Sequence, residues 1–273
     1  MYNLNFFALM QRYSHFILII SVISLLTTGC FEEAVETNGD LNGNDNENGE
    51  PGEFSHTLNP GESNEAFVTD ENYSTLIVEI QFMAGAEPEE EALQNVAAFL
   101  EQNLQKEEVI LLEPQQIPSL NQNVYNVNDL AQIEENNREY FTDDDQLAAY
   151  ILIVDGDYLE QDALSVAYFN TSVALFGTTI NRISGPQQFD PSKESVEATL
   201  IKHQFGHLMG LVNNGTEMVE NHHDEFNGAH CALEQCLMNF RINSANFYES
   251  FFQNAEFELS QFCIADLEEL KNS

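Results

Sequence analysis

Short apolar runs alternate with amphipathic stretches from Tyr73 onward, and this alternation is the main structural signal in the chain. Apolar and β-branched residues are concentrated in four segments, which predicts strands over 74–83, 109–112, 148–154 and 165–176. The third of these, AAYILIV, is almost continuously apolar, so we expect a central strand buried on both faces. The fourth is expected to form one strand, or two strands around a bend at Asn170.

Two helices are predicted between the strands. Residues 88–105 carry apolar side chains at spacings of three and four, and Pro88 suits the first helical position. Residues 127–141 are predicted to form a second helix, with Asn128 as its cap. Strands and helices in alternation predict a layered α/β or α+β fold around one sheet.

A further helix is predicted late in the chain, packed beneath the sheet. Asp190 suits its N-cap, Pro191 its first helical position, and Gly210 the point where it stops. His203 and His207 recur along one face of this helix together with apolar residues. The pattern therefore places two histidines on a helix that faces the core.

The first residues have the pattern of an export signal. Arg12 is the only charge before an apolar run over 16–26, which is too short to cross a membrane. The run leads into Thr27–Cys30, which resembles the lipobox of bacterial lipoproteins, where cleavage leaves Cys30 to be lipidated. We therefore expect residues 1–29 to be a lipoprotein signal peptide; the alternative is an ordinary signal peptide with an incidental cysteine.

Residues 30–55 are acidic and rich in glycine and asparagine, so they are predicted to form a disordered tether. Acidic residues directly after a lipidated cysteine resemble the signal that sends some lipoproteins to the outer face of the outer membrane. The expected location is the bacterial cell envelope, with a lipid anchor at the outer membrane and exposure at the cell surface. Residues 56–273 are long enough to form one domain with its own core.

The charge balance limits the partners of this domain. The chain has 46 acidic and 8 basic residues, for a formal net charge of −38. Such a protein repels nucleic acids and anionic lipid surfaces. We therefore expect no nucleic acid partner, and contact with a membrane only through the lipid anchor.

Histidines are clustered in the last third of the chain. Of the seven in the chain, five lie between positions 203 and 230. His203 and His207 are four apart on the predicted helix, so both side chains leave one face and can share a metal ion. Such a pair alone is more often structural, but His222, His223 and His230 follow within a short distance. The cluster therefore favours a metal site.

Two motifs in this region resemble those of zinc proteases. Residues 203–210, HQFGHLMG, are similar to the H-E-x-x-H-x-x-G helix of the metzincins. Residues 230–238, HCALEQCLM, resemble the H-C-x4-C-x-M signature of the archaemetzincins, and residues 210–218 resemble a group of predicted membrane-anchored bacterial metalloproteases. Together the likeness covers about residues 193–266. It implies a metzincin-like mixed twisted sheet with an active-site helix beneath it, a small C-terminal subdomain, and hydrolysis of a peptide or protein substrate by zinc-activated water.

The resemblance also implies the ligands of a catalytic zinc. His203 and His207 match the first two ligands, whereas Asn213 stands where a metzincin has its third histidine. His230 is the first choice for the third ligand because it precedes a cysteine as the archaemetzincin histidine does, and His222 is the alternative. Weaker candidates are His223 and Asp224.

Other residues of the resemblance imply supporting roles. Met238 matches the methionine of the turn beneath the metal, although an ordinary core methionine would pack in nearly the same way. Cys231 and Cys236 could form a small disulfide loop. Alternatively, both could hold a second, structural zinc together with Cys263 and Asp266, although archaemetzincins carry a further cysteine there.

Gln204 departs from the zincin pattern, which has a glutamate after the first histidine. That glutamate takes a proton from the zinc-bound water, and a glutamine side chain cannot do so. Three functions remain open: a protease with another proton acceptor such as His222, His223 or Asp224, a pseudoprotease that binds zinc and peptide, or a zinc-holding protein without a cleft. In the first two, an edge strand within 165–176 is expected to hold the peptide.

Overall fold

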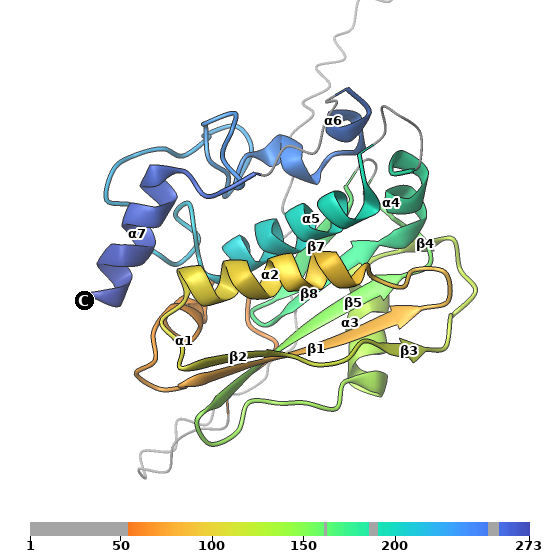
Figure 1. Cartoon of the computed structure of the whole chain (residues 1–273), viewed down its shortest axis with the longest axis horizontal. Coiled ribbons are helices and arrows are strands. Elements are labelled where there is room, and N and C mark those ends of the chain that lie inside the picture. The colour runs from red at the N-terminus through yellow and green to blue at the C-terminus, as the bar shows by residue number, and fades with distance from the viewer. Residues whose placement is uncertain (1–53, 161–162, 186–190, 251–256) are drawn as a thin grey trace, which may run out of the picture. The chain divides into compact units, whose positions relative to one another are not determined.

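The computed structural model describes residues 54–160, 163–185, 191–250 and 257–273 (Figure 1). The expected signal peptide, the lipidation site at Cys30 and almost all of the expected tether lie outside these residues. Within the described part, no helix has the length and apolar character needed to span a bilayer.

Strands and helices alternate along the described chain, as the apolar pattern predicts. The strands are β1 (Thr75–Met83), β2 (Glu108–Leu111), β3 (Gln115–Ile117), β4 (Val124–Tyr125), β5 (Gln146–Val154), β6 (Asp157–Tyr158), β7 (Ser165–Phe169) and β8 (Ser172–Phe176). The helices are α1 (Asn64–Val68), α2 (Glu90–Asn103), α3 (Val127–Asn137), α4 (Gly177–Ile183), α5 (Lys193–Leu208), the 3₁₀ helix η1 (Phe240–Asn243), α6 (Ala245–Ser250) and α7 (Gln261–Lys271).

One mixed sheet organises the fold, which confirms the α+β prediction. Its strand order is β2-β1-β5-β8-β7, and β3 pairs with the end of β1 beyond β2. All pairs are parallel except β7 with β8, so the single antiparallel strand lies at an edge of the sheet. The 165–176 segment therefore forms two strands, and among the described residues β7 pairs with no strand except β8, which leaves its other edge free there.

Helices cover both faces of the sheet (Figure 1). Along β5, Ile151 and Ile153 pack into the core formed with α2 and α5, whereas Leu152 and Val154 pack into the core formed with α3. All four side chains are fully buried. A strand sandwiched between helix layers has to be apolar on both faces, which explains the uninterrupted apolar run in its sequence.

Local hydrogen bonds shift the helix starts from their predicted positions. Pro88 and Pro191 each lie directly before the N-cap residue rather than at the first helical position. The N-cap of α5 is Ser192 and not Asp190, because the Ser192 hydroxyl accepts a hydrogen bond from the backbone N–H of Ser195.

The cap of α3 is corrected in the same way. It is Asn126 and not Asn128, since the Asn126 side chain accepts hydrogen bonds from the backbone N–H groups of Asn128 and Asp129. The Asp129 carboxylate returns a bond to the N–H of Asn126, which completes a capping box.

A buried ion pair fixes α3 to the sheet. The guanidinium of Arg138 is 2.6 Å from a carboxylate oxygen of Glu134, and both side chains are buried. Arg138 also donates to the carbonyl of Ala148 and to the hydroxyl groups of Thr171 and Ser172. One side chain therefore holds the end of α3, β5 and the β7–β8 turn together.

Replacing Arg138 should destabilise the fold far more than removing a charge at the surface. Arg138→Met leaves the Glu134 carboxylate buried without its partner, so we expect a loss of about 3–5 kcal/mol in urea unfolding. The control is Glu268→Gln, which breaks the exposed pair with Lys271 and should cost less than about 1 kcal/mol. Equal losses in the two variants would contradict this role for Arg138.

Candidate metal centre

Helix α5 presents two histidines one turn apart and then ends abruptly. His203 and His207 are both buried on this helix. After the cap at Met209, the backbone N–H of Gly210 bonds the carbonyl of His207, and the N–H of Leu211 bonds the carbonyl of Gly206. Gly210 has a φ of +73°, as this glycine-ended helix terminus requires. The chain therefore turns away directly after the second histidine.

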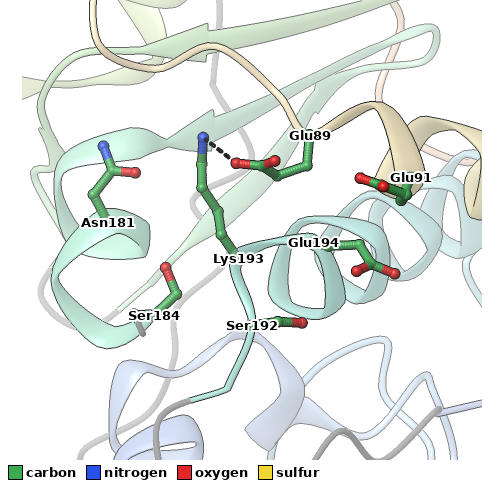
Figure 2. Close-up of a pocket in the computed structure, with 8 residues that line it drawn as sticks. Glu89, Glu91, Asn181, Ser184, Ser192, Lys193 and Glu194 are labelled. Carbon is green, nitrogen blue, oxygen red and sulfur yellow. Dashed lines mark ion pairs between the residues drawn. The ribbon is translucent and has the colours of Figure 1, made fainter. Parts of the chain in front are cut away.

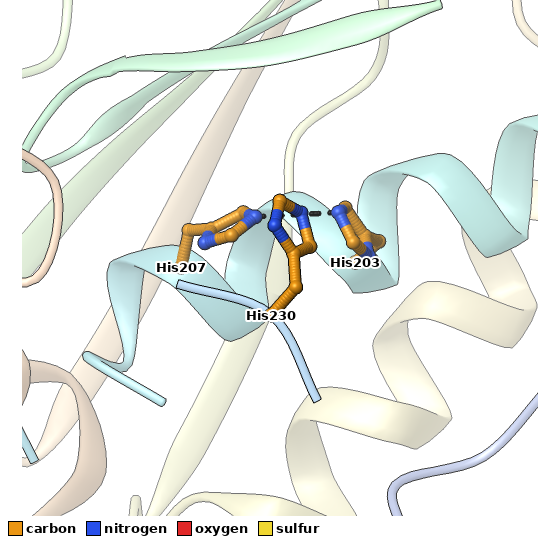
Figure 3. A group of neighbouring side chains, drawn as sticks. All are labelled: His203, His207 and His230. Carbon is orange, nitrogen blue, oxygen red and sulfur yellow. Dashed lines mark hydrogen bonds between the residues drawn. The ribbon is translucent and has the colours of Figure 1, made fainter. Parts of the chain in front are cut away.

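His230 joins the pair from the loop that follows (Figure 3). The ligand nitrogens of the three histidines all lie within 4.8 Å of one another. The Nε2 atoms of His203 and His207 are 3.2 Å apart. Two nitrogens bound at about 2.0 Å to one tetrahedral zinc lie roughly 3.3 Å apart, so the pair has the spacing that zinc needs.

Backbone carbonyls orient two of the three rings. Nδ1 of His203 donates to the carbonyl of Leu237 at 2.7 Å, and Nδ1 of His230 donates to the carbonyl of Asn227. Ligand histidines characteristically use their second nitrogen in this way, which fixes the tautomer and leaves Nε2 for the metal. Nδ1 of His207 is buried and finds no partner among the described residues.

Burial keeps these imidazoles in the form that binds metal. Loss of contact with water and, to a smaller extent, the nearby His230 lower the pKa of His203 to about 3. Burial likewise lowers the pKa values of His207 and His230. Neutral imidazoles are the form that binds zinc, and the ring nitrogens of the three histidines converge here close enough to share one ion. The donor set therefore fits zinc.

A methionine closes the site from the side of the helix. At Gly206, an added Cβ would lie 2.2 Å from the sulfur of Met238, so any other residue there would force the methionine side chain to move. Met238 therefore rests directly on the helix between the two histidines, at the position that the sequence resemblance assigns to it.

Gln204 points toward the edge strand and is engaged there. Its Nε2 donates to the hydroxyl of Ser165 at 2.8 Å, and that hydroxyl donates to the side-chain oxygen of Asn243 at 2.8 Å. The Asn243 amide also bonds both the N–H and the carbonyl of Ser165, at 2.8 Å each. This network, which ties the position of the usual catalytic base to β7, could not be predicted from the residue pattern.

Two of the three alternative proton acceptors are also held by hydrogen bonds. Nε2 of His223 bonds the carbonyl of Gly228 at 2.7 Å. The carboxylate of Asp224 accepts from the backbone N–H of Phe226 and from the side-chain amide of Asn227. Neither side chain joins the three-histidine group.

A second cluster gathers the three cysteines and His222. Nδ1 of His222 lies 3.3 Å from the sulfur of Cys231 and 3.9 Å from that of Cys263, and the sulfurs of Cys236 and Cys263 are 3.6 Å apart. Nε2 of His222 donates to the carboxylate of Asp266 at 2.8 Å. The structure thus places His222 in this cluster and not at the first centre, and Asp266 orients the histidine instead of facing the thiols.

The three sulfurs have the arrangement of metal ligands rather than of a disulfide. All three cysteines are free and buried, so the structure does not contain the small loop between Cys231 and Cys236. Hydrogen bonds from Cys231 and Cys263 lower the pKa of the Cys236 thiol, the bond with Cys236 raises the pKa of Cys231, and the bonds with Cys231 and then Cys236 raise that of Cys263. Sulfurs bound at about 2.3 Å to one zinc lie roughly 3.8 Å apart, close to the 3.6 Å between the sulfurs of Cys236 and Cys263.

A shallow pocket of about 400 Å³ lies at the start of α5 (Figure 2). It contains Lys193, which pairs with Glu89 at 3.6 Å and with Glu197 at 3.4 Å. Lys193 precedes His203 by ten residues, or roughly 15 Å along a helix, so the pocket is separate from the histidines. Among the described residues that line the pocket, Lys193 is the only cation, and it already forms ion pairs with these two carboxylates.

Comparisons with known proteins add a distant similarity. No protein-family model and no curated protein matches the chain. Among solved structures, it is similar to archaemetzincin from Methanopyrus kandleri, with 12% sequence identity and a TM-score of 0.49. The match covers 74% of this chain and 98% of that chain. Likeness at this level carries no weight for function, which has to rest on the geometry of the site.

Proposed function

We propose that this chain is a zinc metallopeptidase-like protein that holds a peptide beside a three-histidine zinc centre and hydrolyses it slowly or not at all. The observation that carries the proposal is the convergence of His203 and His207, both buried, with the half-buried His230, and two of the three rings are oriented by carbonyls. When bound, zinc would polarise a peptide carbonyl and lower the pKa of a bound water.

Weak or absent hydrolysis follows from the groups around the zinc site. Gln204 cannot take a proton, and general acid–base help is typically worth about 10²–10⁴ in rate. His223 and Asp224 are bonded within their own loop, and His222 belongs to the cysteine cluster. Peptide binding does not require a proton acceptor, so we expect binding to remain where hydrolysis is lost.

The free edge of β7 is the proposed binding surface for the peptide. Along an antiparallel strand, backbone groups point alternately toward and away from the paired strand. Asn243 occupies the outward-facing groups of Ser165. Ala167 is the next residue with outward-facing groups, so an extended peptide would add to the sheet there.

The cluster of His222, Cys231, Cys236 and Cys263 favours a second role for zinc, as a structural ion. Two backbone N–H groups, from Met238 and Ser260, bond the sulfur of Cys236 at 3.4 Å each, which stabilises a thiolate. Four nitrogen and sulfur ligands without a position for water are typical of structural zinc.

Gln204→Glu should create or strongly raise peptidase activity. The carboxylate can accept both the proton of a zinc-bound water and the hydrogen bond of the Ser165 hydroxyl, so the variant should fold. We expect cleavage of a peptide library at least about 100-fold faster than by the natural chain, and abolished by chelator. His207→Gln in the same background should be inactive. Equal, chelator-sensitive cleavage by the natural chain would show that another residue acts as the base.

Ala167→Pro should weaken peptide binding without disturbing the metal. Proline removes the N–H that faces away from β8 and leaves the pairing of Val166 with Ala174 in place. Fluorescence anisotropy with labelled peptides should show at least about tenfold weaker binding than for Ala167→Val, which keeps the N–H. Unchanged affinity with normal zinc content would argue against the β7 edge as the binding surface.

We propose that Cys30 carries a lipid that anchors the protein in the bacterial envelope. The support is the lipobox-like sequence over 27–30. Metabolic labelling with a fatty acid should mark the natural chain, and Cys30→Ala should abolish the label and release the protein from membranes. Labelling that persists in the variant would contradict the anchor.

A further inference from the structure

The two clusters share one stretch of backbone. His230 belongs to the histidine centre, and the next residue, Cys231, belongs to the cysteine cluster. Cys236 lies in the cysteine cluster, whereas the carbonyl of Leu237 orients His203 and the side chain of Met238 lies against α5. Neighbouring residues of one short segment thus serve the two centres.

The third histidine ligand depends on a short hairpin that returns to the cysteine cluster. The backbone N–H of Ala232 bonds the carbonyl of His222 at 2.8 Å, and the N–H of Asp224 bonds the carbonyl of His230 at 2.7 Å. His222 and Cys231, at the base of this hairpin, are both members of the second cluster. Any ion that holds them also holds the base from which His230 projects.

The segment that carries this hairpin has no regular secondary structure of its own. Residues 209–239, which the structure describes throughout, contain no helix and no strand, only isolated bridges. Long segments of this kind need a ligand, a metal or tight packing to hold one conformation. A second link, from the N–H of Cys231 to the carbonyl of Met238 at 2.7 Å, also starts at a cysteine of the cluster.

We propose that a divalent ion of the zinc type in the cluster of His222, Cys231, Cys236 and Cys263 raises the metal affinity of the histidine centre by fixing His230. This inference rests on the proposed function of the histidine centre and assigns its regulation. Without the second ion, ordering the hairpin would cost conformational entropy each time the first centre binds metal. The coupling is reciprocal, so an ion at the histidine centre must strengthen binding at the cysteine cluster by the same factor.

Cobalt titration of the metal-free full chain tests the coupling without any activity assay. Cobalt bound by thiolates gives a charge-transfer absorption, and cobalt at the histidine centre gives only weaker d–d bands. In Cys263→Ser, the charge-transfer absorption should fall, and cobalt affinity at the histidine centre should fall at least about tenfold, within the usual range of coupling between sites. The matched control is Ile264→Ser, at the exposed neighbouring position on α7, which should bind as the natural chain does.

Asp266→Asn provides a milder perturbation that retains all four ligands. It weakens the orientation of His222, and such changes typically cost 10–100-fold in affinity at the adjacent metal. His207→Gln gives the reciprocal measurement, with weaker cobalt binding at the cysteine cluster than in the natural chain.

The outcomes separate the two proposals. If Cys263→Ser and Asp266→Asn lose affinity at the cysteine cluster and keep the natural affinity at the histidine centre, the coupling is overturned and the histidine centre stands. If the natural chain binds cobalt only at the cysteine cluster, the proposed function fails at its first requirement, and the coupling fails with it.

Discussion

The contact between the Met238 sulfur and α5 at Gly206 is the constraint on which both centres depend. Since Gly206 lacks a side chain, the sulfur of Met238 can lie directly against the helix between its two histidines. The carbonyl of the preceding residue, Leu237, lies 2.7 Å from Nδ1 of His203, and Cys236, one residue earlier, belongs to the cysteine cluster. A larger residue at position 206 would displace the Met238 side chain from the turn that carries both Leu237 and Cys236.

The parts of the fold that follow apolar periodicity were predictable from sequence. Strand β5 and helix α2 agree closely with their predicted ranges, because a buried strand or an amphipathic helix needs its apolar residues at fixed spacings. Helix starts were less predictable, since several polar residues near each start compete as caps. Ser192 and Asn126 prevail because their side chains reach free N–H groups of the first turn.

The metal ligands also differ in how far the sequence could predict them. His203 and His207 could be paired from their spacing on a helix, and the resemblance already favoured His230 as the third ligand. The contact of His222 with the cysteine cluster could not be predicted from the sequence. His222 lies in a loop without periodicity, where contacts depend on how the chain folds back. Asp266 has the right position in sequence for a ligand of the second ion, but a histidine lies between its carboxylate and the thiols.

The glutamine in place of the catalytic glutamate changes the chemistry more than the structure. An amide at position 204 donates to the hydroxyl of Ser165, whereas a carboxylate would accept from it, so the exchange reverses that hydrogen bond and takes the hydroxyl proton away from the side-chain oxygen of Asn243. The bonds between Asn243 and the backbone of Ser165 do not depend on that direction. The edge strand therefore keeps its position beside α5 whichever residue is present. Loss of the proton acceptor is thus separable from loss of the peptide-binding edge, and a chain of this kind can bind a substrate that it does not cleave.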